Sequence, residues 1–370
     1  MDQTVATALP GEAAAEERHG FAFHGAAMEF FRIWIVNIAL SIVTLGIYSA
    51  WAKVRTMRYF YGNTELDAHR FDYLANPLVI LRGRLIAFSV LAAASIASSF
   101  DLLVGISLYY IVIPFLLVPF ATLLSLRFRA RMSQYRNVRF GFDGSIGGAY
   151  WAFVAWPLFT LFSFFVLSPL GYRARQHYMV GKSRFGRLPF SLSLEGWPLY
   201  KSYIIAALVG MLSFAVVSII GGVIAVVIAG VISATGADAE TDPAVIEMLV
   251  TFLNPITYIS ILLYVGLAAL LNAYLTNYTL SNTHIEGGHR LESTLDPFRY
   301  AWISMSNMAV IGLTFGLGIP WARVRMARYR AANTALITTG SLDAIATQEE
   351  EDTSATGQEF ADFMGLEIGF

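Results

Sequence analysis

Two short basic segments combine a tryptophan, several cations and a tyrosine at helical spacing. They comprise Trp51, Lys53, Arg55, Arg58 and Tyr59 in the first segment and Trp321, Arg323, Arg325, Arg328 and Tyr329 in the second. On a helix, this spacing sets an aromatic ring at the membrane boundary and cations at the headgroup level, where each cation contributes about 1 kcal/mol of attraction to anionic lipid. The same residues also suit simple topological anchoring. We therefore regard them as candidates for binding lipid or another anion.

Polar residues inside apolar segments form a second group of candidates, namely Asn37, Thr44, Asn307 and Thr314. An amide in such a segment needs a hydrogen-bond partner because water is scarce. Two interpretations of the asparagines are open: they bond a neighbouring helix, or they line a polar pathway through the membrane. We expect the threonine hydroxyls to bond carbonyl oxygens of the preceding helical turn.

Catalytic signatures are absent from the sequence. Cysteine is missing, which excludes disulfides and thiolate chemistry, and the six histidines form no His-Glu-x-x-His pair. There is no Walker loop, no Gly-x-Ser-x-Gly elbow and no dinucleotide fingerprint, and the carboxylates form no evident acid/base pair. We expect neither an enzyme nor a metal site, and no cofactor and no nucleic-acid partner.

The elements that carry these residues are apolar segments of membrane-spanning length. The chain has 370 residues, of which 56% are hydrophobic and 14% charged, and its mean hydropathy of +0.58 exceeds what a soluble core could bury. A helix of about 20 apolar residues crosses the hydrocarbon layer. Seven segments approach or exceed this length: roughly 30–50, 78–99, 102–126, 147–169, 202–234, 248–276 and 300–320.

An internal repeat connects the two basic segments. Residues 19–64 align with residues 289–334 at a constant offset of 270, with identical residues at 14 of 46 positions. A more diverged copy lies at an offset of 119, where Phe21 and Phe23 align with Phe140 and Phe142. That middle copy lacks the tryptophan and most of the arginines. Each copy contains an alternating strand-like stretch, an apolar segment, a basic amphipathic stretch and a second strand-like stretch.

We therefore predict a mainly α polytopic membrane protein with seven hydrophobic helical segments and three repeats with short strand-like flanks. The predicted organisation is a disordered N-terminus (1–18), repeat 1 (19–77), transmembrane hairpin 1 (78–126), repeat 2 with a basic connection (127–198), transmembrane hairpin 2 (199–278), repeat 3 (279–340) and an acidic disordered tail (341–370).

The distribution of charge predicts a topology. All 25 lysines and arginines lie outside the tips of the two long hairpins, whereas the tips carry acidic residues such as Asp101 and Asp238. By the positive-inside rule, the tips face the periplasm and the basic connections face the cytoplasm. Seven consecutive spans would place two strongly basic connections on opposite faces, so we favour four spans and three repeat helices that re-enter or lie at the interface. Seven spans stay open as the alternative, because inverted repeats are common in transporters.

The motifs resemble those of a known family. The segments Gly20–Gly25, Thr44–Tyr48 and Trp51–Arg55, followed by Arg58-Tyr59-Phe60 and Phe71-Asp72-Tyr73, resemble the YjgN family of bacterial inner-membrane proteins, also called domain of unknown function 898. The resemblance runs from about residue 20 to residue 340 and implies a multi-pass protein of the bacterial cytoplasmic membrane. It implies no activity, because none is established for the family.

Two functional hypotheses follow. The first is transport of a small solute or a lipid-related molecule, suggested by the duplicated hairpins and by polar residues at repeat-equivalent positions. The second is a non-transporting membrane organiser whose basic repeats bind anionic lipid or a partner membrane protein. Membrane lipids, anionic by charge complementarity, are the expected partners in either case.

Overall fold

The chain divides into two compact units in a computed structural model that describes residues 16–235 and 243–339. Within the described residues, the first unit comprises 16–194, 279–293 and 331–339. The second comprises 195–235, 243–278 and 294–330. All the strands belong to the first unit, and the helices are shared between the two.

Short antiparallel strands close into a barrel in the first unit. In the described chain there are ten: β1 (Glu16–Phe23), β2 (Thr64–Leu66), β3 (His69–Tyr73), β4 (Ser133–Tyr135), β5 (Val138–Phe142), β6 (Ser183–Phe185), β7 (Leu188–Leu192), β8 (Thr283–Ile285), β9 (His289–Ser293) and β10 (Thr334–Thr339). Each strand pairs with its neighbours in sequence, and β1 closes the barrel by pairing with β10, where His19 lies opposite Leu336. Closure removes every exposed strand edge.

Tight turns join the strands in pairs at one end of the barrel. Asp67 and Ala68 connect β2 to β3 with φ of 48° and 58°, and Arg136 and Asn137 connect β4 to β5 with φ of 47° and 62°. Two consecutive residues with positive φ match the right-handed twist of the flanking strands. These turns set the register that directs alternate side chains into the barrel.

Helical excursions connect the strands at the opposite end. They are α1 (Ala27–Val43) with α2 (Ser49–Gly62); α3 (Pro77–Phe100) with α4 (Leu102–Ser107), a π-helical stretch (Leu108–Leu117) and α5 (Val118–Met132); α6 (Ile146–Tyr150), a π-helical stretch (Trp151–Ala155) and α7 (Trp156–Phe162) with α8 (Ser168–Met179); α9 (Gly196–Thr235) with α10 (Pro243–Ser281); and α11 (Pro297–Leu313) with α12 (Ile319–Ala332). Each excursion leaves one strand and returns to the strand beside it, as where Phe23 pairs with Thr64 and Tyr73 with Ser133. Both ends of every excursion therefore lie side by side.

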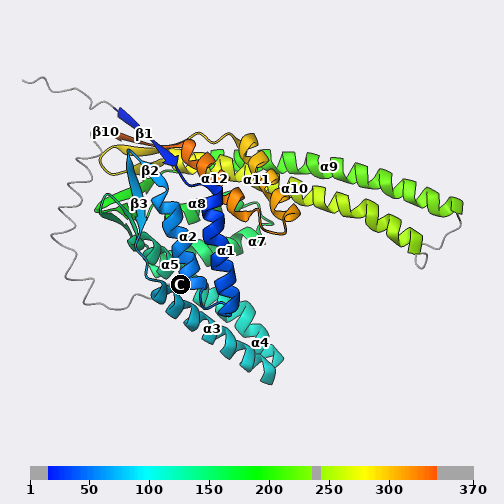
Figure 1. The fold of residues 1–370 in the computed structure, drawn as a ribbon, viewed down its shortest axis with the longest axis horizontal. Helices are drawn as coiled ribbons and strands as arrows, with labels where there is room; N and C mark the ends of the chain where they lie inside the picture. Colours follow the sequence, from blue (N-terminus) through cyan, green and yellow to red (C-terminus); the bar gives the residue numbers. More distant parts are fainter. Residues whose placement is uncertain (1–15, 236–242, 340–370) are drawn as a thin grey trace, which may run out of the picture. The chain divides into compact units, whose positions relative to one another are not determined.

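Four helices in the described chain are long and apolar enough to cross a membrane. They are Pro77–Phe100, Leu103–Met132, Gly196–Ala234 and Ile256–Ser281, with 24, 30, 39 and 26 residues. They form two antiparallel pairs, and the pairing of α9 with α10 is visible in Figure 1. Four of the seven predicted segments, 78–99, 102–126, 202–234 and 248–276, correspond to these helices.

The three other predicted segments are broken by a turn. In 30–50, 147–169 and 300–320 the chain reverses after Val43, Phe162 and Leu313. The reversals use the same backbone conformation, with φ of 50° at Leu45, Phe164 and Phe315. Because each helix ends at its turn, none of these segments is one continuous helix of spanning length.

The first and third turns are held by the predicted threonines. The Thr44 hydroxyl donates to the Leu40 carbonyl at 2.7 Å and accepts from the Tyr48 N–H at 3.0 Å. The Thr314 hydroxyl donates to the Val310 carbonyl at 2.6 Å. The prediction that these hydroxyls bond the preceding helical turn is confirmed.

Other predictions have mixed outcomes. The strand-like stretches at Phe21–Phe23 and Phe140–Phe142 are strands, but the sequence did not indicate that they close into a barrel. The predicted disordered N-terminus is wrong at residues 16–18, which pair with β10. Its remainder and the predicted acidic tail from 341 lie outside the described residues, and the division into repeats stays a prediction.

Candidate functional site

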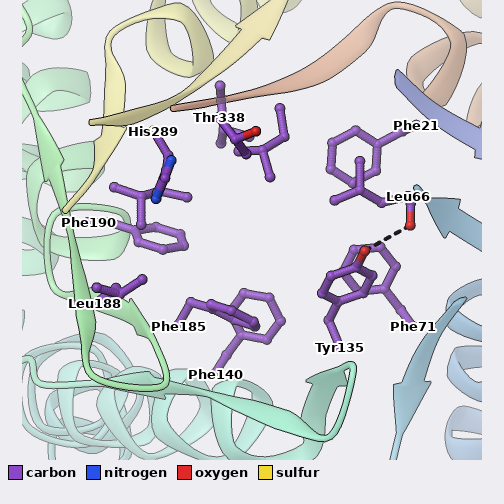
Figure 2. A pocket seen from close by; sticks show the side chains of 13 residues that line it. Phe21, Leu66, Phe71, Tyr135, Phe140, Phe185, Leu188, Phe190, His289 and Thr338 are labelled. Carbon is purple, nitrogen blue, oxygen red and sulfur yellow. Dashed lines mark hydrogen bonds between the residues drawn. The ribbon is translucent and has the colours of Figure 1, made fainter. Parts of the chain in front are cut away.

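The barrel encloses an apolar cavity of ≈190 Å³. Figure 2 shows side chains from opposite strands pointing into it. Its lining consists of Phe21, Leu66, Phe71, Tyr135, Phe140, Phe185, Leu188, Phe190, Ile285, His289, Leu291, Leu336 and Thr338. We call this cavity the lumen.

Strand alternation arranges most of these side chains in two layers. The third residue of each short strand, and the third of β10, gives the first layer: Leu66, Tyr135, Phe185, Ile285 and Leu336. The second layer comes from the longer strands β1, β3, β5, β7 and β9, each of which contributes the third residue from its C-terminal end. These residues are Phe21, Phe71, Phe140, Phe190 and Leu291. Successive side chains of a strand point to opposite faces, so this spacing aims all ten inward.

Aromatic rings stiffen the wall of the lumen. The ring centroids of Phe71 and Tyr135 lie 4.7 Å apart, and those of Phe140 and Phe185 lie 5.2 Å apart. The Tyr135 hydroxyl donates a hydrogen bond of 2.8 Å to the Leu66 carbonyl, so its proton is not available to a ligand in the lumen. An apolar cavity of about 150 Å³ lined by Leu, Ile and Phe can hold a benzene molecule. The lumen is therefore large and apolar enough for part of a hydrocarbon.

Two further polar side chains, His289 and Thr338, line the lumen. His289 is 6% exposed, and its Nδ1 accepts a hydrogen bond of 3.2 Å from the Thr339 N–H. Burial lowers the His289 pKa below its ordinary value, which keeps the ring neutral and able to accept. The Thr338 hydroxyl lies 3.1 Å from His19 Nε2.

A second cavity of ≈310 Å³ adjoins the lumen on the side of the helices. It shares the side chains of Phe71, Phe140 and Phe190 with the lumen. Helices α2 and α5 contribute Tyr61 and Arg129, among other residues. We call this second cavity the antechamber, and Arg129 brings a permanent positive charge to it.

Two further cations lie near Arg129. The pKa of Lys53, on α2, is lowered by burial and then by the positive charges of Arg84 and Arg129. Arg84, on α3, donates to the Ser49 hydroxyl. The helices that carry these three cations, α2, α3 and α5, pack together in one apolar core that includes Val54, Ile80 and Phe128. In the described chain, no three His, Asp or Glu side chains gather to hold a metal ion.

Comparison with known proteins identifies the family. The family model described as "Bacterial protein of unknown function (DUF898)" matches residues 18–363. The chain belongs to this family. The inner membrane protein YjgN of Salmonella typhimurium is 26% identical to it over 374 residues, covering 90% of this chain and 91% of the relative. The protein of that name from Escherichia coli K12 is 25% identical over 378 residues, covering 92% and 93%. No solved structure matches the chain.

In this DUF898 protein, the basic residues predicted on α2 have different surroundings. Arg58 donates to the carbonyls of Tyr73 and Ala75, both at 3.3 Å, and Tyr59 donates to the carbonyl of Ala26 at 2.9 Å. These two residues therefore hold the fold. Trp51 packs on the apolar core between α2, α3 and α5, and Arg55 is exposed. Lys53 alone of the five lies beside the cations of the antechamber.

The basic residues predicted on α12 also serve internal contacts. Arg325 donates to the Ser306 hydroxyl at 2.7 Å and to Asn307 Oδ1 at 3.1 Å, and its guanidinium lies 4.9 Å from the centre of the Trp321 ring. Tyr329 donates to the Asp296 carbonyl at 3.2 Å. Desolvation lowers the pKa of Arg323, and both Arg323 and Arg328 have interaction partners.

The polar-pathway candidates are not gathered in one place. Asn307 Nδ2 donates to the Ala322 carbonyl at 3.2 Å, which joins α11 to α12. Asn37 is 4% exposed, and neither polar atom of its side chain has a partner among the described residues. Neither asparagine lines the lumen or the antechamber.

Sequence reasoning missed the lumen residues and Arg129. The alternation of Phe21 with Phe23 and of Phe140 with Phe142 did indicate strands with one apolar face. The same spacing at Phe71 and Tyr73, and at Phe190 and Leu192, could have extended the pattern. The meeting of those faces in one closed barrel had no local signal.

Proposed function

We propose that this protein binds the apolar chain of a lipid-related molecule in its barrel and handles that molecule at the bacterial inner membrane. One observation carries the proposal: the closed barrel has a hollow apolar lumen and is joined to helices long enough to span a membrane. Entry of a polar solute would leave its polar groups without partners, which costs several kcal/mol. A hydrocarbon chain pays no such penalty.

The number of membrane crossings follows from the way in which each helical excursion returns to the barrel. Both ends of each excursion lie at one end of the barrel, so each crosses the bilayer an even number of times or not at all. Helices α2 and α12 have 14 residues each and carry Lys53, Arg55 and Arg58 or their counterparts. They are too short and too polar to span about 30 Å. We therefore propose four spans and three short hairpins that dip into the membrane without crossing.

The tips of the short hairpins support this placement. Leu45, Phe164 and Phe315 are 94%, 89% and 98% exposed. Bulky apolar side chains this exposed are costly in water and stable in lipid. The tips act as shallow membrane anchors, and the basic residues behind them lie at headgroup level.

The short hairpins also support the proposed threefold repeat. The hydroxyls of Tyr59, Tyr178 and Tyr329 each donate to the carbonyl of the residue 33 positions earlier, at 2.9, 2.9 and 3.2 Å. The longer excursion of α9 and α10 has a related contact, from the Glu195 N–H to the Tyr278 hydroxyl at 2.9 Å. We propose that all excursions are variants of one helical hairpin between two strands.

Photolabelling tests the proposal directly. The protein is incubated in phosphatidylcholine nanodiscs with a twelve-carbon acid bearing a terminal diazirine, illuminated and digested for mass spectrometry. We expect label on lumen residues of β5, β6 and β7. Leu336→Trp fills the lumen and should reduce that label at least fivefold, whereas Leu208→Trp, at a 61% exposed position of α9, should not. Label confined to the long helices would refute chain binding. Leu291→Phe is the milder variant if Leu336→Trp fails to fold.

Cysteine labelling tests the orientation, because the protein has no native cysteine. With the barrel in the cytoplasm, as the positive-inside rule indicates, a membrane-impermeant maleimide added to spheroplasts should label Ser99→Cys near a hairpin tip. It should label Ser191→Cys, on β7, only after the membrane is opened. The reverse order would place the barrel in the periplasm.

Liposome experiments separate lipid handling from the other two hypotheses. Reconstituted protein that accelerates movement of a fluorescent lipid between leaflets or vesicles supports lipid handling. Saturable flux of a soluble solute that Asn37→Leu abolishes would support solute transport. Unchanged lipid movement with strong retention on anionic vesicles would support the membrane organiser.

A further inference from the structure

Three cations lie on helices that pack together in one apolar core, and one of these cations lines the antechamber. Arg129 lines the antechamber, and the positive charges of Arg84 and Arg129 both act on Lys53. The residues come from α2, α3 and α5 of the first unit. Like charges on neighbouring helices repel one another, and the repulsion is relieved by an anion.

No carboxylate neutralises this cluster within the part of the chain that the structure describes. The arginine ion pairs found there involve Arg18, Arg136, Arg184 and Arg290. Lys53, Arg84 and Arg129 have no acidic partner within 4.0 Å among the described residues. The positive charge of the cluster is therefore not neutralised by the described residues and can attract an anionic ligand.

The cavities adjacent to the cluster match the shape of an amphiphile. The antechamber, at ≈310 Å³, is the wider of the two and contains Arg129 and the hydroxyls of Tyr61 and Ser133. The Ser133 hydroxyl donates to the Tyr61 hydroxyl at 3.0 Å. The lumen, at ≈190 Å³, is apolar, and Phe71, Phe140 and Phe190 line both cavities. A polar head in the antechamber thus has an adjoining apolar space for its chain.

We infer that Arg129, assisted by Lys53 and Arg84, binds the phosphate group of an amphiphile whose apolar chain lies in the lumen. This inference rests on the proposed function, because it assigns the headgroup of the same ligand. A guanidinium presents two parallel N–H donors that match phosphate oxygens, and a lysine adds a compact positive charge. Phosphate is favoured over a neutral sugar or choline head because the cluster carries three positive charges and has no acidic partner among the described residues.

Competition against the diazirine label tests the inference. The competitors are dodecyl phosphate, dodecyl maltoside with the same chain and a neutral head, and inorganic phosphate. The wild-type protein should bind dodecyl phosphate at least tenfold more tightly than dodecyl maltoside. In the Lys53→Met/Arg129→Met protein this preference should fall below threefold. Arg55→Met, two residues from Lys53 on the same helix and exposed, is the matched control and should keep the full preference.

Each other outcome has a defined meaning. Equal affinities in the wild type, or a tenfold preference that survives the double substitution, would overturn the phosphate site. Inorganic phosphate that acts at the same concentration as dodecyl phosphate would overturn the amphiphile and indicate free phosphate. If dodecyl maltoside displaces the label at the same concentration as dodecyl phosphate, chain binding stands although the headgroup site fails; if no competitor displaces the label, the proposed function fails as well. If the double variant does not fold, Arg129→Lys replaces it as the test. This substitution keeps the positive charge, and it should reduce the preference for dodecyl phosphate over dodecyl maltoside about threefold.

Discussion

The hydroxyl of Tyr59 donates a hydrogen bond of 2.9 Å to the carbonyl oxygen of Ala26, across 33 residues of chain. Ala26 directly precedes α1, and Tyr59 lies in the last turn of α2, so the bond closes the base of the first short hairpin. The bond from Tyr178 to Ser145 closes the base of the hairpin formed by α7 and α8 in the same way, also at 2.9 Å. Each of these two tyrosines thus joins the end of its hairpin to the beginning of the same hairpin.

Removing one of these hydroxyls should weaken the fold. Tyr178→Phe keeps the ring packed against Phe142 but leaves the Ser145 carbonyl without this partner. We expect a loss of about 1 kcal/mol, measured as denaturant or thermal unfolding in detergent. Tyr110→Phe, at a residue that is 73% exposed, is the matched control and should have no effect. An equal loss in both variants would contradict a specific role for the bond.

Asn37 and Asn307 should respond to substitution in opposite ways. Asn307→Leu removes the bonds to Ala322 and Arg325 and should destabilise the protein by about 1–3 kcal/mol. Asn37→Leu removes polar atoms that have no partner among the described residues, so stability should stay the same or rise. Thermal unfolding of the two purified variants in one detergent compares them, and a marked loss in Asn37→Leu would reveal a partner for Asn37.

The turn at the tip of the third short hairpin depends on glycine. Gly316 has a φ of 90°, which an L-residue adopts only with strain. Gly316→Ala should cost about 1–2 kcal/mol. Gly312→Ala lies in helix α11 with open space around the added methyl, and it should be neutral or stabilising by up to about 1 kcal/mol. Melting temperatures that shift together in both variants would argue against backbone strain as the cause.

Acidification should destabilise the barrel through His289. Burial lowers the pKa of this histidine in the folded state, so the unfolded chain takes up the proton first as the pH falls. The contribution of His289 to stability is therefore complete above about pH 6.5 and declines below it. Protonation would also abolish the bond that Nδ1 accepts from the Thr339 N–H.

The measurement is the melting temperature between about pH 7.5 and about pH 5.5, on either side of the ordinary histidine pKa. His289→Asn retains an acceptor oxygen near the position of Nδ1 and should reduce the loss of stability over this range. Part of the pH dependence should remain in this variant because of His177, whose pKa is also lowered by burial and by Arg173. His284→Asn, on the exposed side of the neighbouring strand, should leave the pH dependence unchanged. An unaltered pH dependence in His289→Asn would refute the role of this ring.

Local patterns predicted the local structure well. The apolar lengths of 78–99, 102–126, 202–234 and 248–276 matched the four long helices. The hydroxyls of Thr44 and Thr314 bond where expected, since a threonine in a helix reaches its own preceding turn. The length of an apolar run and the reach of a short side chain are properties of neighbouring residues, so they can be read from the sequence.

The candidate site was predicted only in part. Lys53 was recognised as a cation that could meet an anion, but Arg58, Tyr59 and Arg325 turned out to bond the protein itself. A basic residue near a membrane looks the same in sequence whether it faces lipid or a backbone carbonyl. The choice depends on which carbonyls lie within reach, and this is known only once the helices are packed.

The amino-acid sequence is enough to identify a membrane protein of the DUF898 family with long apolar helices, because composition, hydropathy and motif spacing are carried by contiguous residues. The tertiary structure is needed to see that strands as far apart as β1 and β10 pair, that the apolar faces of the strands enclose a lumen, and that Arg84 and Arg129 lie on helices packed against the helix of Lys53. Strands of three to eight residues have little stability alone, so their partners are set by closure of the whole barrel. The hollow apolar interior, on which the proposed function rests, is therefore a product of long-range pairing.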